Sequence, residues 1–226
     1  MHGLMGSNNN YPAQGKFEAK NLGCSRNDRA LFAALNLSVE PGQVLLLEGE
    51  NGSGKTTLLR ILCGYRQQDQ GQLLWNGKAV TEIADYFQYI SYVGHKNGVK
   101  DELSVEENLK MMSSMMSTSV IKIKDVLKQI GLFKYSDVMT KQLSAGQKRK
   151  LALARLLMTA RPFWMLDEPF TSLDKSSVSY FEGVIKEHIQ RNGMLILTSH
   201  HEVDLGGLNV NRFDLSAWRK KQTDDV

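Results

Sequence analysis

Residues 49–57, with the sequence GENGSGKTT, have the composition and spacing of a loop that binds phosphate groups. They fit the pattern G-x-x-x-x-G-K-[ST], and they follow an apolar run and precede a predicted helix. Glycines let backbone N–H groups point at phosphate oxygens, and the helix start adds partial positive charge. Lys55 can reach the β- and γ-phosphates of a nucleotide, and the Thr56 hydroxyl can bind Mg²⁺. The residues predicted to bind nucleotide are Gly49, Glu50, Asn51, Gly52, Ser53, Gly54, Lys55, Thr56 and Thr57. The alternative is a glycine-rich turn without a ligand.

Residues 163–168, FWMLDE, form a second apolar run, and this one ends in two acids. Asp167, at the end of the predicted strand, can hold Mg²⁺ directly or through water. Glu168 is then positioned to polarise an attacking water as a general base. Acids also end strands and begin turns routinely. The pair indicates chemistry because it follows a phosphate loop, and together the two segments predict hydrolysis of a nucleoside triphosphate.

A third segment begins at Gln142 with the sequence QLSAGQKRKLALARLLM. Ser144 and Gln147 have the spacing of a capping box that opens an amphipathic helix. In a purely structural interpretation, Lys148, Arg149 and Lys150 form a solvated face of that helix. The same helix start can also bind an anion through a hydroxyl, a glycine N–H and the helix dipole. The residues alone leave both interpretations open.

Strands are predicted around these segments from their apolar patterns. Residues 17–24 and 31–39 alternate as antiparallel strands do, and Asn76-Gly77 is typical of a hairpin turn. The short apolar runs within residues 43–49, 163–168 and 193–201 are typical of buried parallel strands. Apolar strands that alternate with helices predict an α/β fold around a parallel sheet.

Helical patterns begin near residue 100. Ser104 and Glu107 form a predicted capping box, residues 119–131 have helical spacing up to Gly131, and residues 175–190 form a further helix. We expect a helical insertion over about 100–158. The methionine-rich residues 111–116 are expected to pack within helices and not to bind a ligand.

Composition and spacing give no indication of nucleic-acid binding, of a cysteine metal site or of a membrane span. The 226 residues carry a net charge of +4, which permits an anionic partner but does not indicate nucleic acid. The two cysteines, Cys24 and Cys63, lack metal-site spacing and are expected to be buried free thiols. No apolar run reaches the ~18 residues that a membrane span needs. Residues 1–15 lack signal-peptide features and are expected to be a disordered lead, and residues 219–226 a polar tail.

Five motifs in order give the chain, from about residue 17 to 215, a resemblance to the ABC-type ATPases. They are residues 49–56, the signature segment LSAGQ at 143–147, Asp167 with Glu168, the SLD at 172–174, and His200. The resemblance implies a P-loop NTPase core of the ABC type with an antiparallel β subdomain and an inserted helical subdomain, as one domain over 16–218. ATP and Mg²⁺ are the implied ligands.

The same resemblance implies a homodimer in which two chains dock head to tail. Ser144, Gly146 and Gln147 would then contact the γ-phosphate of ATP bound to the partner chain. Asp174 would lie in the loop that crosses the dimer interface, and His200 would sense the γ-phosphate. Lys55, Glu168 and His200 are thus the expected catalytic residues, and Thr56, Asp167 and His95 the expected metal site.

Further details are similar to one branch of the family, the ATPase subunits of cytochrome c maturation systems, or haem exporters. His95 stands where most members have Gln, the signature segment has SAG where most have SGG, and residues 21–32 read NLGCSRNDRALF. This implies a peripheral subunit on the cytoplasmic face of the inner membrane, beneath integral membrane subunits that meet it around residues 95–130. It would drive release of a haem-loaded periplasmic chaperone, or haem export, without binding haem itself. The alternative is the ATPase of another small ABC transporter.

Two positions depart from the usual family pattern. Members generally stack adenine on an aromatic residue, and Arg26 stands at that position, where a guanidinium can stack on a base. His95 replaces a neutral amide. Two other classes are alternatives: a non-transport ATPase that clamps DNA or the ribosome, and a haem-binding module that uses the histidines at 95, 188, 200 and 201. The single phosphate loop and the absence of long heptads and of a haem-attachment motif argue against both.

We predict that ATPase activity weakens at mildly acidic pH because of His95. Histidine gains a proton near neutral pH, and a protonated imidazole offers no lone pair to Mg²⁺ or water. The His95→Gln variant should therefore retain more of its activity as the pH falls, when rates are measured over a pH series at saturating Mg·ATP. An acid limb that is the same in both proteins would contradict this role.

Overall fold

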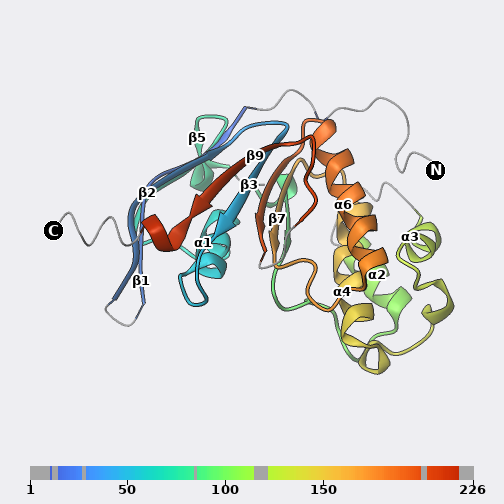
Figure 1. Ribbon diagram of the computed structural model, residues 1–226. Helices are drawn as coiled ribbons and strands as arrows, with labels where there is room; N and C mark the ends of the chain where they lie inside the picture. Colours follow the sequence, from blue (N-terminus) through green and yellow to red (C-terminus); the bar gives the residue numbers. More distant parts are fainter. Residues whose placement is uncertain are drawn as a thin grey trace.

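The computed structural model describes residues 11, 15–26, 29–83, 86–114, 122–199 and 203–218. Alternating apolar residues form a four-stranded antiparallel sheet of order β2-β1-β4-β5, which lies on the left of Figure 1. Its strands are β1 Phe17–Arg26, β2 Arg29–Val39, β4 Gln70–Trp75 and β5 Lys78–Ala79. The predicted β1–β2 pair is confirmed. The Asn76-Gly77 hairpin is also confirmed, since Trp75 pairs with Lys78 and both turn residues have positive φ (53° and 77°).

The continuous apolar runs form the second sheet, in which all neighbouring strands are parallel and the order is β6-β7-β8-β3-β9. Its strands are β3 Gln43–Glu48, β6 Ile90–Val93, β7 Phe163–Asp167, β8 Met194–Thr198 and β9 Asn209–Asp214. Successive residues of β3 pack into different cores: Leu45 and Leu47 on one face, Val44 and Leu46 on the other. Burial of both faces explains why these strands lack apolar–polar alternation.

Helix α1, Lys55–Leu62, fills the space between the two sheets (Figure 1). Leu58, Leu59 and Leu62 are fully buried there and share a core with β1 and with one face of the parallel sheet. The core on the opposite face of the parallel sheet also contains residues from the remaining helices. These are α2 Val105–Ser114, α3 Ile123–Gln129, α4 Ala145–Leu153, α5 Arg155–Met158 and α6 Lys175–Gln190.

The helix starts agree with the predicted capping boxes. The Ser104 hydroxyl accepts from the Glu107 N–H while the Glu107 carboxylate accepts from the Ser104 N–H, and Ser144 with Gln147 repeat the pattern at α4. The helix predicted over 119–131 is shorter, since α3 begins at Ile123 and ends at Gln129, and residues 119–121 lie outside the described residues. Among the described residues, 3₁₀ turns occur at Val80–Glu82, Tyr86–Tyr89, Phe133–Tyr135 and Thr140–Gln142.

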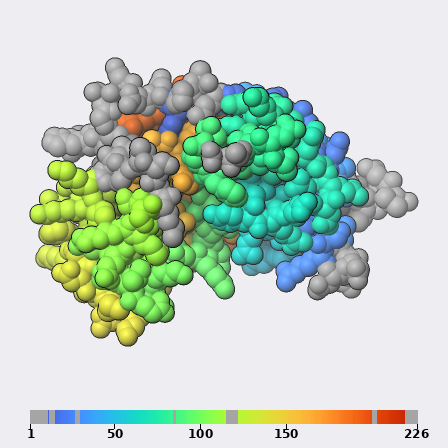
Figure 2. Space-filling view, turned by 180° about the vertical axis from the view of Figure 1, so that it is seen from behind, coloured from blue at the N-terminus to red at the C-terminus, as the bar shows by residue number. Residues whose placement is uncertain are grey.

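Helices α2 to α5 lie between β6 and β7 in the chain, and Figure 2 shows α2 and α3 in a lobe beside the body that carries the earlier strands. Met112 packs into the helical core, whereas the methionines at 115 and 116 lie outside the described residues. Cys24 and Cys63 are buried and free, as expected. Burial raises the pKa of the Cys63 thiol to about 11. Within the described ranges, no helix is long and apolar enough to cross a membrane.

His188, on α6, is buried and is a structural residue. Its ring stacks on Trp164 with centroids 3.7 Å apart, and its nitrogens contact the Tyr11 hydroxyl (3.0 Å) and the Met194 carbonyl (3.1 Å). Both nitrogens are therefore engaged, which excludes His188 from the set of haem ligands considered above. Burial lowers the pKa of His188 to about 3, with a smaller contribution in the same direction from Arg191, while the hydrogen bond to the Met194 carbonyl opposes the decrease.

We predict that His188 makes stability depend on pH. The imidazole is neutral in the folded chain and gains a proton in the unfolded chain below about pH 6.5. The free energy of unfolding should therefore fall as pH decreases from about 6.5 towards 3, by up to about 1.4 kcal/mol per pH unit. Denaturant titrations of His188→Gln should show a smaller slope in that range. His95→Gln, on an exposed loop, is the matched control, and equal slopes for wild type and His188→Gln would contradict the prediction.

Candidate functional site

Residues 49–54 connect β3 to α1 and adopt a backbone that glycine permits. Gly49, Gly52 and Gly54 have φ of 140°, 81° and 107°. There is also no room for a side chain at Gly49, because an added Cβ would meet the Ser53 hydroxyl at 2.9 Å and the Ser216 hydroxyl at 3.0 Å. The Ser216 hydroxyl accepts from the Glu50 N–H at 2.8 Å. The phosphate loop is therefore fixed by a residue that follows β9.

Lys55 lies within this loop and is 8% exposed. Its ammonium donates to the carbonyls of Gly49 (2.6 Å) and Glu50 (3.0 Å). Such contacts hold the cation at the centre of the loop, where an anionic group could replace the carbonyls as its partner. The position agrees with the role predicted for Lys55, which stays a prediction.

Asp167, the last residue of β7, joins three elements through its buried carboxylate, and it is 2% exposed. Oδ2 accepts from the Thr56 hydroxyl at 2.7 Å, and Oδ1 accepts from the Thr198 hydroxyl at 2.8 Å. Thr56 belongs to α1 and Thr198 ends β8. The structure thus brings together two of the three predicted metal ligands, Thr56 and Asp167. It adds Thr198, a residue that sequence reasoning missed.

Glu168 has an unusual backbone conformation for a residue with a side chain, with φ of 49°. Its N–H donates to the Thr198 hydroxyl (2.9 Å) and lies 3.2 Å from the Thr198 carbonyl oxygen. The left-handed conformation turns the chain at the end of β7, and the half-buried side chain follows directly after the buried Asp167. The adjacency expected of a metal-binding acid and a general base is therefore present.

His95 lies on an exposed loop two residues after β6. Because β6 pairs with β7 in parallel, with Val93 opposite Leu166, the loop leaves the sheet at the same edge as Asp167. This edge also carries the phosphate loop, since β3 is part of the same parallel sheet. The loop positions His95 on the correct side of the sheet, and its contact with a metal or water stays a prediction.

The signature segment lies at the start of α4, where Ser144 is the N-cap. Gly146 packs tightly against residues 172–174, since an added Cβ would lie 2.5 Å from the Ser172 carbonyl oxygen. Asp174 caps α6, and its carboxylate accepts from the Ser176 hydroxyl (2.7 Å) and the Ser177 N–H (2.8 Å). These hydrogen bonds hold the pKa of Asp174 at about 2, below its ordinary value.

Two groups of predicted residues are therefore separated by the parallel sheet. Lys55 and Thr56 belong to α1, which packs on one face, and the signature segment opens α4, which packs on the other. Figure 1 shows α1 and α4 on opposite sides of β7. Lys55 and Thr56 are suited to holding phosphates and a cation. The signature segment is a helix start at which Ser144 is exposed.

One interpretation from the sequence is wrong. Lys148 and Lys150 are partly exposed, as a solvated face requires, but Arg149 is 3% exposed. Its guanidinium reaches the end of β7, so the basic run is a solvated face only in part. No local signal marks this burial. The isolated hydroxyls of Thr198 and Ser216 were missed for the same reason, because each finds its partner far away in the chain.

Two predicted residues are not tested by this geometry. Arg26 ends β1 with an exposed side chain, and its stacking on adenine stays a prediction. His200 follows the end of β8 by two residues and lies outside the described residues, as does the histidine at 201.

Sequence comparison identifies relatives of this chain. The sequence profile of the ABC transporter family matches residues 32–171. A protein of Nitrosospira multiformis named "Cytochrome c biogenesis ATP-binding export protein CcmA" is 39% identical over 202 residues, covering 88% of this chain and 98% of its own. The protein of the same name from Dechloromonas aromatica is 42% identical over 201 residues, with the same coverage.

Solved structures agree with the fold. An ABC transporter ATP-binding protein from Pyrococcus furiosus superposes with a TM-score of 0.74 at 27% identity, covering 89% of this chain and 98% of that one. An ATP-binding cassette in a dimeric post-hydrolysis state, bound to ADP and phosphate, gives a TM-score of 0.72 at 19% identity, covering 82% and 88%. The expected α/β architecture of the ABC type, with its antiparallel and parallel sheets, is confirmed.

Proposed function

The chain belongs to the ABC transporter family, and on that premise we propose that it is the ATP-hydrolysing subunit of a membrane ABC complex for c-type cytochrome biogenesis. The observation that carries the hydrolytic activity is the 2.7 Å hydrogen bond between Thr56 of the phosphate loop and Asp167, with Glu168 next in the chain. Relatives about 40% identical over nearly the whole chain, all named for cytochrome c biogenesis, support the branch.

ATP binds along residues 49–57 in this proposal. Backbone N–H groups of the loop and the start of α1 receive the phosphates. Lys55 exchanges its two carbonyl partners for β- and γ-phosphate oxygens and offsets their charge. Arg26 stacks its guanidinium on the adenine ring.

Thr56 and Asp167 fit a magnesium ion. Hydroxyl and carboxylate oxygens are the hard donors that Mg²⁺ takes, and these two atoms already lie together beside the phosphate loop. His95 is the third proposed contact, directly or through water. When bound, the ion neutralises charge on the β- and γ-phosphates.

Hydrolysis in this proposal is a single displacement at the γ-phosphorus. Glu168 accepts a proton from water as the water oxygen bonds to phosphorus, and the bond to the bridging oxygen breaks to release ADP and phosphate. Thr198 holds the Glu168 N–H and so keeps the carboxylate beside the site. Lys55 stabilises the developing charge, and His200 contacts the γ-phosphate.

Each chain supplies half of a nucleotide site, so we propose a homodimer with the two chains arranged head to tail. Ser144, Gly146 and Gln147 of one chain approach the γ-phosphate on the other, and Asp174 lies in the crossing loop. Two observations support this: the phosphate loop and the signature segment lie on opposite faces of one sheet, and a similar ATP-binding cassette is a dimer with ADP and phosphate.

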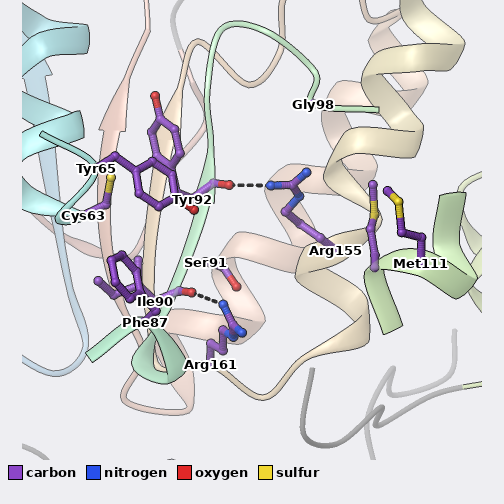
Figure 3. A pocket seen from close by; sticks show the side chains of 11 residues that line it. Cys63, Tyr65, Phe87, Ile90, Ser91, Tyr92, Gly98, Met111, Arg155 and Arg161 are labelled. Carbon is purple, nitrogen blue, oxygen red and sulfur yellow. Dashed lines mark hydrogen bonds between the residues drawn. The ribbon is translucent and has the colours of Figure 1, made fainter. Parts of the chain in front are cut away.

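Integral membrane subunits are the proposed partners, and the chain would lie peripherally beneath them on the cytoplasmic face of the inner membrane. A groove of about 240 Å³ offers a docking surface that includes part of residues 95–130. Figure 3 shows Gly98 and Met111 on one side of it and the rings of Tyr65 and Phe87 on the other. Tyr65 and Phe87 are 63% and 50% exposed and stack on each other.

The groove fits a partner segment that carries an acid beside apolar residues. Arg155 and Arg161 both line it and donate to the carbonyls of Tyr92 and Ile90, as the dashed lines in Figure 3 mark. Within the described part of the chain, the buried Nε of Arg155 has no hydrogen-bond partner. A carboxylate from the partner would complement the positive charges of Arg155 and Arg161.

The work that hydrolysis supports is release of a haem-loaded periplasmic chaperone, or haem export, by the membrane subunits. The chain itself binds neither haem nor nucleic acid in this proposal. The other candidate is the ATPase of a different small ABC transporter, and identification of the bound membrane subunits separates the two.

We predict that Glu168→Gln binds Mg·ATP and accumulates as a dimer while its turnover falls at least about 100-fold, since a general base contributes about 10²–10⁴ to the rate. Phosphate release and size-exclusion chromatography measure the two effects. Glu102→Gln, an exposed carboxylate on a loop, is the control, and chelation of Mg²⁺ should stop turnover of the wild type. A Glu168→Gln variant that turns over at the normal rate would remove Glu168 from the base role.

We also predict that Tyr65→Ala combined with Phe87→Ala weakens binding to the membrane subunits by at least tenfold, because these rings supply exposed apolar surface to the groove. Purification from detergent-solubilised membranes, with mass spectrometry of the bound subunits, measures this. Tyr135→Ala, an exposed aromatic outside the groove, is the control. Recovery of cytochrome c maturation subunits supports the branch, and recovery of another transporter's subunits would contradict it.

A further inference from the structure

Arg149 is a buried cation beside the site. It lies in the second turn of α4, the helix that the signature segment opens, and it is 3% exposed. Its neighbours Lys148 and Lys150 are partly exposed, so the guanidinium is the member of the basic run that points inward. A charge in this environment costs free energy unless every donor is satisfied.

All five N–H donors of the guanidinium have an acceptor. Nε donates to the Pro169 carbonyl (2.8 Å), and one terminal nitrogen donates to the carbonyls of Asp167 (2.9 Å) and Glu168 (2.8 Å). The other terminal nitrogen donates to the Gly94 carbonyl (2.8 Å) and the Asn97 amide oxygen (3.1 Å). One side chain thus holds the turn after β7 and the loop that carries His95.

The acceptors are neutral oxygens and the cation remains charged. Burial lowers the pKa of Arg149 to about 10, and the charges of Asp167 and Glu168 oppose that decrease. At neutral pH the side chain therefore keeps its proton and its planar set of donors. A lysine has no such fork and could reach only some of these carbonyls at once.

Glu168 is held from both sides of its backbone. Its N–H donates to Thr198, and its carbonyl accepts from Arg149. A residue with a side chain adopts φ near 49° only where its surroundings determine it. Arg149 also binds the peptide groups on either side, at Asp167 and Pro169. The direction of the Glu168 side chain thus depends on contacts from α4.

We propose that Arg149 is a positioning residue for ATP hydrolysis, and the inference rests on the proposed function. Its guanidinium holds the turn after β7, and with it the Glu168 carboxylate, in register with the loop that carries His95. Because Arg149 is part of α4, the signature segment at the start of that helix moves together with this turn. When the signature segment of one chain contacts ATP bound to the other chain, its position therefore influences Glu168 of the chain to which the segment belongs.

The test measures ATP turnover and nucleotide affinity separately in the full chain. Arg149→Met should lower kcat about 10- to 100-fold, because a displacement of about 1 Å at the reacting group can cost about 100-fold. KM and the equilibrium Kd for a fluorescent ATP analogue should change less than about threefold, since Lys55 and the phosphate loop are untouched. Arg149→Lys should give an intermediate kcat. Lys148→Met, in the same helix, is the matched control and should match the wild type.

A second pair of variants keeps the inference testable if Arg149→Met does not fold. Asn97→Ala removes one acceptor and should lower kcat about two- to fivefold with KM unchanged. Combined with Arg149→Lys, its effect should be smaller than in the wild type, because both changes act on one contact.

Several results would overturn the inference. They are an unchanged kcat in a folded Arg149→Met, an equal loss of affinity and kcat, a full rate in Arg149→Lys, or additive effects in the double variant. An inactive wild type would instead contradict the proposed function itself, so the two failures are distinguishable.

Discussion

The buried carboxylate of Asp167 is the contact on which the arrangement of the site depends. It ends β7 and accepts hydroxyl groups from α1 and β8, so a strand, its neighbour and the helix behind the phosphate loop meet at one charged group. A buried carboxylate needs hydrogen-bond donors to replace the water it has lost. The hydroxyls of Thr56 and Thr198 supply one donor to each carboxylate oxygen. Contacts within the chain therefore fix the position of this acid.

The parallel sheet imposes the second constraint. Because its strands are buried on both faces, the chain packs α1 on one face and α4 on the other. The phosphate loop and the signature segment consequently cannot approach each other within one chain without disrupting the sheet. Arg149 reaches from α4 to the turn after β7 and links the two groups mechanically. The sheet therefore separates the phosphate loop from the signature segment, which favours a site shared with a second copy of the chain. Within each copy, Arg149 connects the helix of the signature segment to the turn after β7.

Sequence patterns predicted the features that local chemistry determines. The phosphate loop, the Asn76-Gly77 turn and the capping box at Ser144 each follow from a few adjacent residues, and so does the buried character of the parallel strands. Thr198, Ser216 and Arg149 could not be predicted in the same way. Their partners come from distant segments, and a basic residue in a charged run has no local mark of burial. The positions of Arg26 and His200 relative to nucleotide stay predictions.

Gly146 shows how packing within one chain limits the divergence of a motif. The carbonyl oxygen of Ser172 leaves no room for a Cβ there, whatever the helix start binds in another molecule. Ala145, one residue earlier, is exposed and already carries a methyl group. Packing within the chain therefore leaves room for a side chain at position 145 but not at position 146. A side chain at position 146 would require the Ser172 backbone to shift, so the start of α4 is fixed by the loop that precedes α6.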